Sequence, residues 1–213
     1  MQKLFKTYGL IISLVVAFLV SGCSSSALGP NSVMNYDTKN TLTPDETSAT
    51  ITFFREKQFL RRSWFAAPVA LYDENEDKMI FVGNLDKGTR ATIKLKEGHY
   101  EFAILGDMDF CVLADVEAGK NYYVELLSAP SLLKESYAGR VIKPKDLESD
   151  YYKDLISDNK NCVVNANGAK WFEGKHDEFL RRYKEARQNF DPTGFYDKNA
   201  ILKAQYGIEN ILH

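Results

Sequence analysis

Short apolar runs separated by turn residues fill the middle of this 213-residue chain. Seven runs of apolar or β-branched residues are mostly 9 to 12 residues apart. They begin at Ile51, Pro68, Met79, Ala91, Glu101, Phe110 and Tyr122. This spacing predicts a β-sandwich or barrel of about seven strands.

The alternation is clearest in two of these runs. Residues 91–95 (ATIKL) and 100–104 (YEFAI) place apolar side chains at every second position, which predicts one buried and one solvent-facing side. Gly88, Gly98 and Gly119 mark tight turns between runs. Because no helical pattern of 10 to 15 residues separates the runs, we expect an antiparallel sheet.

After Leu127 the pattern becomes helical. Residues 128–144 contain two prolines and predict a connecting segment, residues 145–157 one short helix, and residues 200–212 another. One longer helix is predicted over 169–190, because Phe172, His176, Phe179, Tyr183, Ala186 and Phe190 recur every three or four residues. We expect this stripe to pack on the sandwich; a stripe left exposed would indicate assembly or a partner groove. The fold class is therefore mainly β with C-terminal helices (α+β).

The N-terminus has the pattern of a secretory signal. Lys3 and Lys6 precede an apolar run from Leu10 to Val20, which is shorter than the roughly 20 residues of a spanning helix. Val20-Ser21-Gly22-Cys23 then resembles the lipobox of bacterial lipoproteins. The resemblance implies cleavage before Cys23, acyl chains on that cysteine and membrane anchoring. Ser24 and Ser25 stand where an acidic residue would favour the inner membrane, so the outer membrane facing the periplasm is expected.

The chain thus divides into four predicted regions. These are a signal peptide (1–22), a flexible tether (23–48) rich in Ser, Thr, Asn and Asp, the β-sandwich (49–127), and a connecting segment with a helical extension (128–213).

A second resemblance covers residues 49–127. Phe54-Arg55, Val82-Gly83-Asn84-Leu85, Gly98-His99-Tyr100 and Ala118-Gly119-Lys120-Asn121-Tyr122-Tyr123-Val124 resemble a family of small bacterial lipoproteins known only as a domain of unknown function. The resemblance implies a transthyretin-like or immunoglobulin-like sandwich and brings no established activity. Glu97 stands where that family often has a proline.

Composition and net charge say little about which class of molecule the protein binds. The chain is 45% hydrophobic and 26% charged, which fits a folded domain, and its net charge of −2 gives no argument for nucleic acid. Cys111 and Cys162 remain after lipidation of Cys23, in a compartment that is oxidising. Two alternatives stay open for them: a disulfide that joins the helical tail to the sandwich, or two separate buried thiols.

No motif predicts catalysis, a metal or a cofactor. The three histidines lack metal-ligand spacing, and Asp73, Asn75 and Asp77 resemble a calcium loop without its glycine and closing acid. A catalytic site assembled from distant residues is left open.

The strongest candidate for binding is the stretch 55–65 (REKQFLRRSWF), expected as a loop between the first two strands. It interleaves Arg61 and Arg62 with aromatic residues including Trp64, a combination that can stack on sugars or hold phosphates and carboxylates. The alternative is that the aromatic residues cap the sandwich and the arginines are solvated.

The sequence therefore predicts a non-enzymatic, lipid-anchored binding or adaptor module of the bacterial envelope, with a protein, glycan or lipid partner. The alternatives are an enzyme, or enzyme modulator, acting on peptidoglycan or envelope lipid, and a structural subunit of an envelope assembly.

Overall fold

The computed structural model describes residues 33–36, 42–57, 66–106, 108–129 and 136–209. Their strands are β1 (Met34–Tyr36), β2 (Ser48–Arg55), β3 (Ala67–Asp73), β4 (Lys78–Leu85), β5 (Thr89–Lys96), β6 (Gly98–Ile104), β7 (Phe110–Val116), β8 (Lys120–Ala129), β9 (Ser136–Ile142), β10 (Lys160–Val164), β11 (Ile201–Leu202) and β12 (Ile208–Glu209). Their α-helices are α3 (Asp150–Asp158), α4 (Ala166–Glu173) and α5 (His176–Gln188). Short 3₁₀ helices are η1 (Pro144–Glu148), η2 (Asp197–Asn199) and η3 (Ala204–Tyr206). The mainly β fold with C-terminal helices is thus confirmed.

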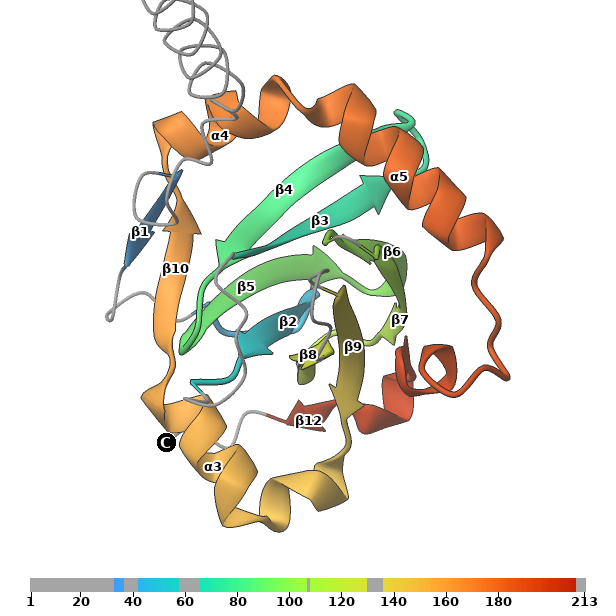
Figure 1. Ribbon diagram of the computed structural model, residues 1–213. Helices are drawn as coiled ribbons and strands as arrows, with labels where there is room; N and C mark the ends of the chain where they lie inside the picture. Colours follow the sequence, from blue (N-terminus) through green and yellow to red (C-terminus); the bar gives the residue numbers. More distant parts are fainter. Residues whose placement is uncertain (1–32, 37–41, 58–65, 107, 130–135, 210–213) are drawn as a thin grey trace, which may run out of the picture.

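The strands form two mixed sheets (Figure 1). The first sheet has the order β1-β10-β5-β2-β8-β12, with β9 also paired to β8. The second has the order β11-β7-β6-β3-β4. All seven strands predicted from the apolar runs are present as β2 to β8.

The prediction of a wholly antiparallel sheet is wrong. Strands β2 and β8 pair in parallel, as do β10 with β5 and β11 with β7. After β2 in the first sheet, the chain forms β3 and β4 in the second sheet and returns to the first for β5. It then forms β6 and β7 in the second sheet and returns to the first for β8. These crossings between sheets, rather than helical crossovers, bring β2 and β8 together in the same direction.

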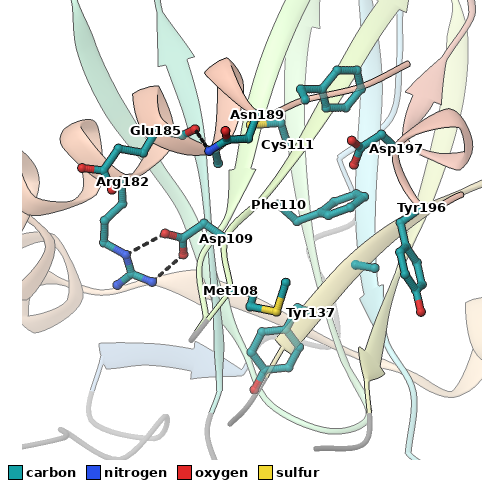
Figure 2. Close-up of a pocket in the computed structure, with 13 residues that line it drawn as sticks. Met108, Asp109, Phe110, Cys111, Tyr137, Arg182, Glu185, Asn189, Tyr196 and Asp197 are labelled. Atoms are coloured by element: carbon teal, nitrogen blue, oxygen red, sulfur yellow. Dashed lines mark hydrogen bonds and ion pairs between the residues drawn. The ribbon is translucent and has the colours of Figure 1, made fainter. Parts of the chain in front are cut away.

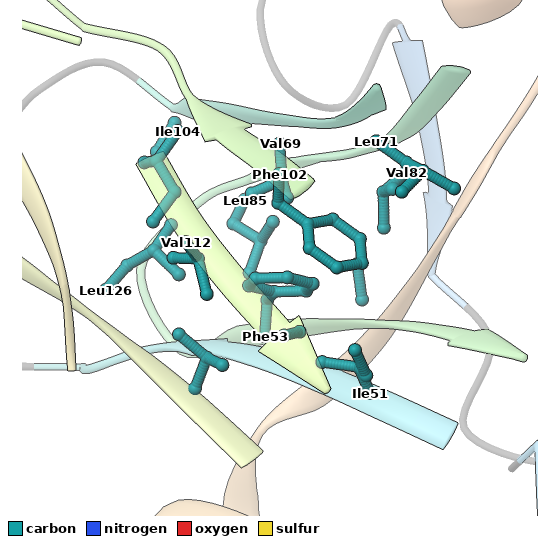
Figure 3. Close-up of a cluster of buried hydrophobic side chains, with 14 of the residues drawn as sticks. Ile51, Phe53, Val69, Leu71, Val82, Leu85, Phe102, Ile104, Val112 and Leu126 are labelled. Carbon is teal, nitrogen blue, oxygen red and sulfur yellow. The ribbon is translucent and has the colours of Figure 1, made fainter. Parts of the chain in front are cut away.

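The core lies between the two sheets. Apolar side chains at alternate positions of β2, β3, β6, β7 and β8 interdigitate there, and the rings of Phe53 and Phe102 meet across the interface at 5.0 Å between centroids (Figure 3). The largest of these side chains are fully buried, so this layer supplies most of the hydrophobic stabilisation.

Helices cover the outer face of each sheet, which alters the predicted pattern of one buried and one solvated side. Ala103, on the outward side of β6, is fully buried in a cluster with Phe172, Phe179 and Tyr183 of α4 and α5. Phe54, on the outward side of β2, is likewise buried under α3. Both faces of β2 are therefore covered, and every residue of this strand is buried.

The predicted helix over 169–190 is two helices. α4 begins earlier, where the side chain of Asn165 accepts a hydrogen bond from Gly168 N at 2.9 Å, and it ends at Glu173, with Gly174 as its C-cap. Lys175 leaves helical geometry (φ −118°, ψ 3°) and α5 starts at His176. This break lets both helices follow the curved sheet (Figure 1), and the apolar stripe packs on it as expected.

Both predicted flanking regions contribute strands. Met34, within the predicted tether, is buried, and β1 pairs with β10. The predicted helical extension supplies β9, β10, β11 and β12, and residues 200–209 hold two short strands around a 3₁₀ helix where a helix was expected. Strands β1, β10, β11 and β12 have only two to five residues each, and strands this short leave little periodicity in a sequence. Among the described residues, no helix is long and apolar enough to cross a membrane.

Candidate functional site

The residues chosen from the sequence as contacts, Arg61, Arg62 and Trp64, lie outside the described residues, as does Cys23. Arg55, at the start of the same stretch, is buried at the end of β2 with 2% of its surface exposed. Its guanidinium donates to the carbonyl of Leu85 at 2.7 Å and lies over the ring of Tyr137. Arg55 therefore stabilises the fold rather than presenting charge to a ligand.

An apolar cavity of about 640 Å³ lies beside the last turns of α5, and we call it the α5 cavity (Figure 2). The start of β7, the start of β9 and the turn before η2 form its other walls. Its lining residues are Met108, Asp109, Phe110, Cys111, Tyr137, Ala138, Arg182, Glu185, Ala186, Asn189, Phe190, Tyr196 and Asp197. This volume and lining are typical of small-ligand or side-chain pockets, which hold about 300 to 1,000 Å³.

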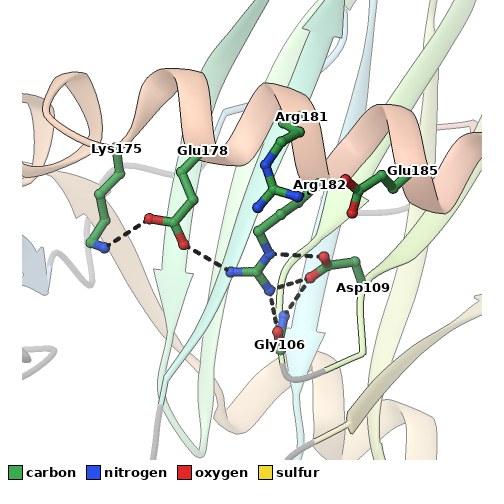
Figure 4. A network of polar contacts seen from close by, with 7 residues as sticks. All are labelled: Gly106, Asp109, Lys175, Glu178, Arg181, Arg182 and Glu185. Atoms are coloured by element: carbon green, nitrogen blue, oxygen red, sulfur yellow. Dashed lines mark hydrogen bonds and ion pairs between the residues drawn. The ribbon is translucent and has the colours of Figure 1, made fainter.

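An ion pair closes one end of the α5 cavity. Arg182 donates through Nε to Asp109 at 2.8 Å, and through Nη2 to Asp109 and the carbonyl of Gly106 (Figure 4). Burial alone would lower the pKa of Arg182, but the hydrogen bonds and the charge of Asp109 outweigh it and raise that pKa. The pair links α5 to the β6–β7 loop, and Arg182 keeps its positive charge at neutral pH.

Exposed apolar side chains stand at the mouth of this cavity. Met108 is 62% exposed and Tyr196 is 59% exposed, while the neighbouring Phe195 is 73% exposed and packs edge-on against Tyr196. Asp191 and Asp197 hold the turn: the Thr193 backbone donates to Asp191, and the Asp191 backbone donates to Asp197. The sequence reasoning missed this turn, although its Pro-Thr-Gly-Phe-Tyr run was the available signal.

A second depression, the polar cleft, lies on the other side of α5 and has a volume of about 710 Å³. Strands β3, β4 and β6 form its floor, and its lining is Leu71, Tyr72, Asp73, Glu74, Asn75, Ile80, His99, Tyr100, Glu101, Tyr183, Lys184, Arg187 and Gln188. α5 therefore separates an apolar cavity from a polar one.

His99 stands at the edge of the polar cleft between two acids. Its Nδ1 is 2.8 Å from a carboxylate oxygen of Asp115, and its Nε2 is 3.7 Å from one of Glu101. Burial raises the pKa of Glu101, but hydrogen bonds from Arg187 and Tyr183 outweigh it, so that pKa lies below its usual value. Glu101 is therefore ionised at neutral pH and ties α5 to β6.

The other polar groups singled out in the sequence serve the fold. His176 accepts a hydrogen bond from the Met79 backbone at 3.2 Å, as expected for a packed histidine. Asp77 binds Lys184 and the hydroxyl of Tyr72. Within the described part of the chain, no group of three or more His, Cys, Asp or Glu side chains could hold a metal ion.

Cys111 and Cys162 are free, buried thiols in the structure, which corresponds to the second of the two alternatives. Cys111 lies in the cluster under α5, and Cys162 lies in the core between the sheets. Burial raises the pKa of each thiol to about 12, so neither is a nucleophile at neutral pH.

We therefore expect both thiols to be unreactive until the protein unfolds. In a Cys23→Ser variant, a thiol reagent without reductant should titrate neither cysteine in buffer at about pH 8, and both in guanidinium chloride. A disulfide would instead give no reactive thiol in guanidinium chloride, and rapid labelling in buffer would contradict burial.

No protein-family model matches the sequence, and no curated protein sequence is significantly similar to it. The resemblance of residues 49–127 to a lipoprotein family stays a prediction.

Proposed function

We propose that this protein is a lipid-anchored lipoprotein of the outer membrane, facing the periplasm and anchored through Cys23, that binds another envelope protein without catalysing a reaction. In this proposal the two sheets are a sandwich of transthyretin-like or immunoglobulin-like type. The partner inserts an apolar side chain into the α5 cavity and packs on Met108, Phe195 and Tyr196.

The observation that carries the proposal is the exposed patch at the mouth of an apolar cavity. Met, Phe and Tyr are enriched at protein interfaces, and strong contacts lie where an anchor side chain fills a pocket. Met108 and Tyr196 line the cavity and are more than half exposed, and Phe195 extends the patch. A folded turn held by hydrogen bonds presents both aromatic residues, so binding would cost little ordering entropy.

The chemistry of the cavity supports binding rather than covalent catalysis. The Arg182 guanidinium and the Asp109 carboxylate are engaged with each other, and the thiol of Cys111 is protonated because burial raises its pKa. An ion pair at the rim can orient an incoming polypeptide, while the apolar walls accept its anchor.

A photo-crosslinking amino acid at Tyr196 of the full-length protein, in intact cells, tests the proposal. We expect one stoichiometric protein adduct, absent when the same probe replaces Tyr36, which is also exposed but lies on β1. After purification of that partner, a Phe195→Ala/Tyr196→Ala variant should bind at least about tenfold more weakly.

Ala186→Trp should weaken binding similarly by filling the α5 cavity, whereas Gln188→Trp, on the other side of α5, should leave it unchanged. Crosslinks to lipid alone, or a partner whose affinity neither Ala186→Trp nor the double alanine variant changes, would rule the proposal out.

One observation favours the alternative class of envelope enzyme. A histidine oriented by a carboxylate, as His99 is by Asp115, is the usual arrangement of a general base. Turnover of peptidoglycan fragments or phospholipid by the wild-type protein that is lost in His99→Ala would establish that class. The structural-subunit alternative loses its main argument, because Phe172, Phe179 and Tyr183 are buried.

A further inference from the structure

The polar cleft differs from the α5 cavity in what its walls offer a ligand. Its lining contains carboxylates, amides, an imidazole and cationic side chains together with tyrosine rings, whereas the α5 cavity is lined mostly by apolar side chains (Figure 2). At about 710 Å³ it is large enough for a ligand of several rings. An inference about the cleft therefore goes beyond the proposed function, which concerns the other side of α5.

Aromatic rings form part of the wall of the polar cleft. Tyr72 is half-buried, and one face of its ring stacks on Tyr183 with 4.5 Å between centroids. The hydroxyl of Tyr72 donates to Asp77, which fixes the ring. Tyr100 also lines the cleft, but its ring lies on the opposite face of the sheet, against the core between the sheets. A rigid tyrosine presents an apolar face for the C–H groups of a ring-shaped ligand.

Polar groups without a partner surround these rings. Among the described residues, the side chains of Glu74, Asn75 and Gln188 make no hydrogen bond within the protein, and all three line the polar cleft. Carboxylate and amide oxygens accept hydrogen bonds and amide nitrogens donate them, so the set can satisfy several hydroxyl groups at once. The Arg187 guanidinium, held on Glu101 by Nε at 2.7 Å and Nη2 at 3.3 Å, keeps its Nη1 donors for a ligand.

The charges of the cleft select against anions. Its lining holds the carboxylates of Asp73, Glu74 and Glu101 against the cations Lys184 and Arg187. Lys184 is paired with Asp77, and Arg187 is paired with Glu101. A phosphate or a uronate would meet both unpaired carboxylate charge and cations that are already neutralised.

From these observations we propose that the polar cleft is a binding site for a neutral oligosaccharide. A pyranose ring packs on Tyr72, and its hydroxyl groups exchange hydrogen bonds with Glu74, Asn75 and Gln188. The site recognises a polyhydroxylated, uncharged ligand, which is part of a cell-wall glycan or of a soluble glucan.

Isothermal titration calorimetry of the full-length lipidated protein tests this assignment. The protein is kept in a detergent without a sugar headgroup, and the probes are the N-acetylglucosamine trimer, cellotriose and an acidic galacturonate trimer. We expect saturable binding of a neutral trimer with a dissociation constant between about 10 μM and 1 mM, and no binding of the acidic trimer.

Two matched double variants locate the ligand. Glu74→Ala/Gln188→Ala removes one acid and one amide from the polar cleft, and should weaken binding about tenfold. Glu185→Ala/Asn189→Ala removes the same two groups from the α5 cavity and should leave the affinity unchanged. All four side chains are exposed, so both variants should fold. Tyr72→Leu should also weaken binding, by loss of stacking.

The two possible sources of the oligosaccharide, a cell-wall glycan and a soluble glucan, give different binding results, and either result supports the proposal. Binding of the N-acetylglucosamine trimer with co-sedimentation on purified peptidoglycan identifies cell-wall glycan, and binding of cellotriose alone identifies a soluble glucan. Absence of heat with both neutral trimers at about 10 mM would overturn the proposal. So would equal binding of the acidic trimer, or an equal loss of affinity in the two double variants. Because the crosslinking test reports on the α5 cavity, its outcome does not decide this one.

Discussion

Replacing Arg140 with methionine should lower the free energy of unfolding by about 3 kcal/mol. Arg140 on β9 donates from Nε at 3.0 Å, and from Nη2, to the carboxylate of Glu125 on β8, whose side chain is fully buried. Tyr151 and Tyr152 of α3 also donate to that carboxylate. Removing the cation leaves a buried charge without its counter-charge, and the two tyrosine hydroxyls compensate only in part.

Chemical denaturation followed by circular dichroism measures this effect. Glu125→Gln added to Arg140→Met should recover most of the loss, because the buried charge is then gone. Arg181→Met removes an arginine from an exposed pair with Glu185 and should change stability by less than about 1 kcal/mol. Equal effects of Arg140→Met and Arg181→Met would show that the Glu125 pair contributes no more than a surface pair.

Phe102→Ala should lower the free energy of unfolding by about 3 to 5 kcal/mol. Phe102 is fully buried between the sheets, and its ring contacts Phe53 of the opposite sheet (Figure 3). Truncation removes apolar contact area and leaves a cavity that close-packed neighbours on two sheets cannot fill.

Urea denaturation of three variants separates burial from residue type. Phe102→Leu should cost less than the alanine variant, because it retains most of the volume. Phe195→Ala, at a residue 73% exposed, should change stability by about 0.5 kcal/mol or less. A Phe102→Ala protein as stable as Phe195→Ala would contradict a core shared by the two sheets.

The candidate sites were the least predictable part of the molecule. The α5 cavity brings Cys111, Ala138, Ala186 and Tyr196 together from four segments, and the polar cleft joins Tyr72 to Gln188. No local motif links positions so far apart in sequence. Conversely, Arg55 belongs to a stretch whose composition predicted binding, yet its side chain is buried at the end of β2. There it contacts the carbonyl of Leu85 and the ring of Tyr137.

Local patterning by itself determined the seven strands β2 to β8, the tight turns at Gly88, Gly98 and Gly119, and a helical stripe that packs on a sheet. Each follows from interactions within a few residues. Alternation of apolar side chains predicts the strands, glycine at positive φ the turns, and apolar residues every three or four positions the helical stripe. Only the tertiary structure decided the rest, including the parallel pairing of β2 with β8, the strands β9 to β12, the break at Gly174 and the two cavities. Such features depend on contacts between distant segments, whose free energy leaves no periodic trace along the chain.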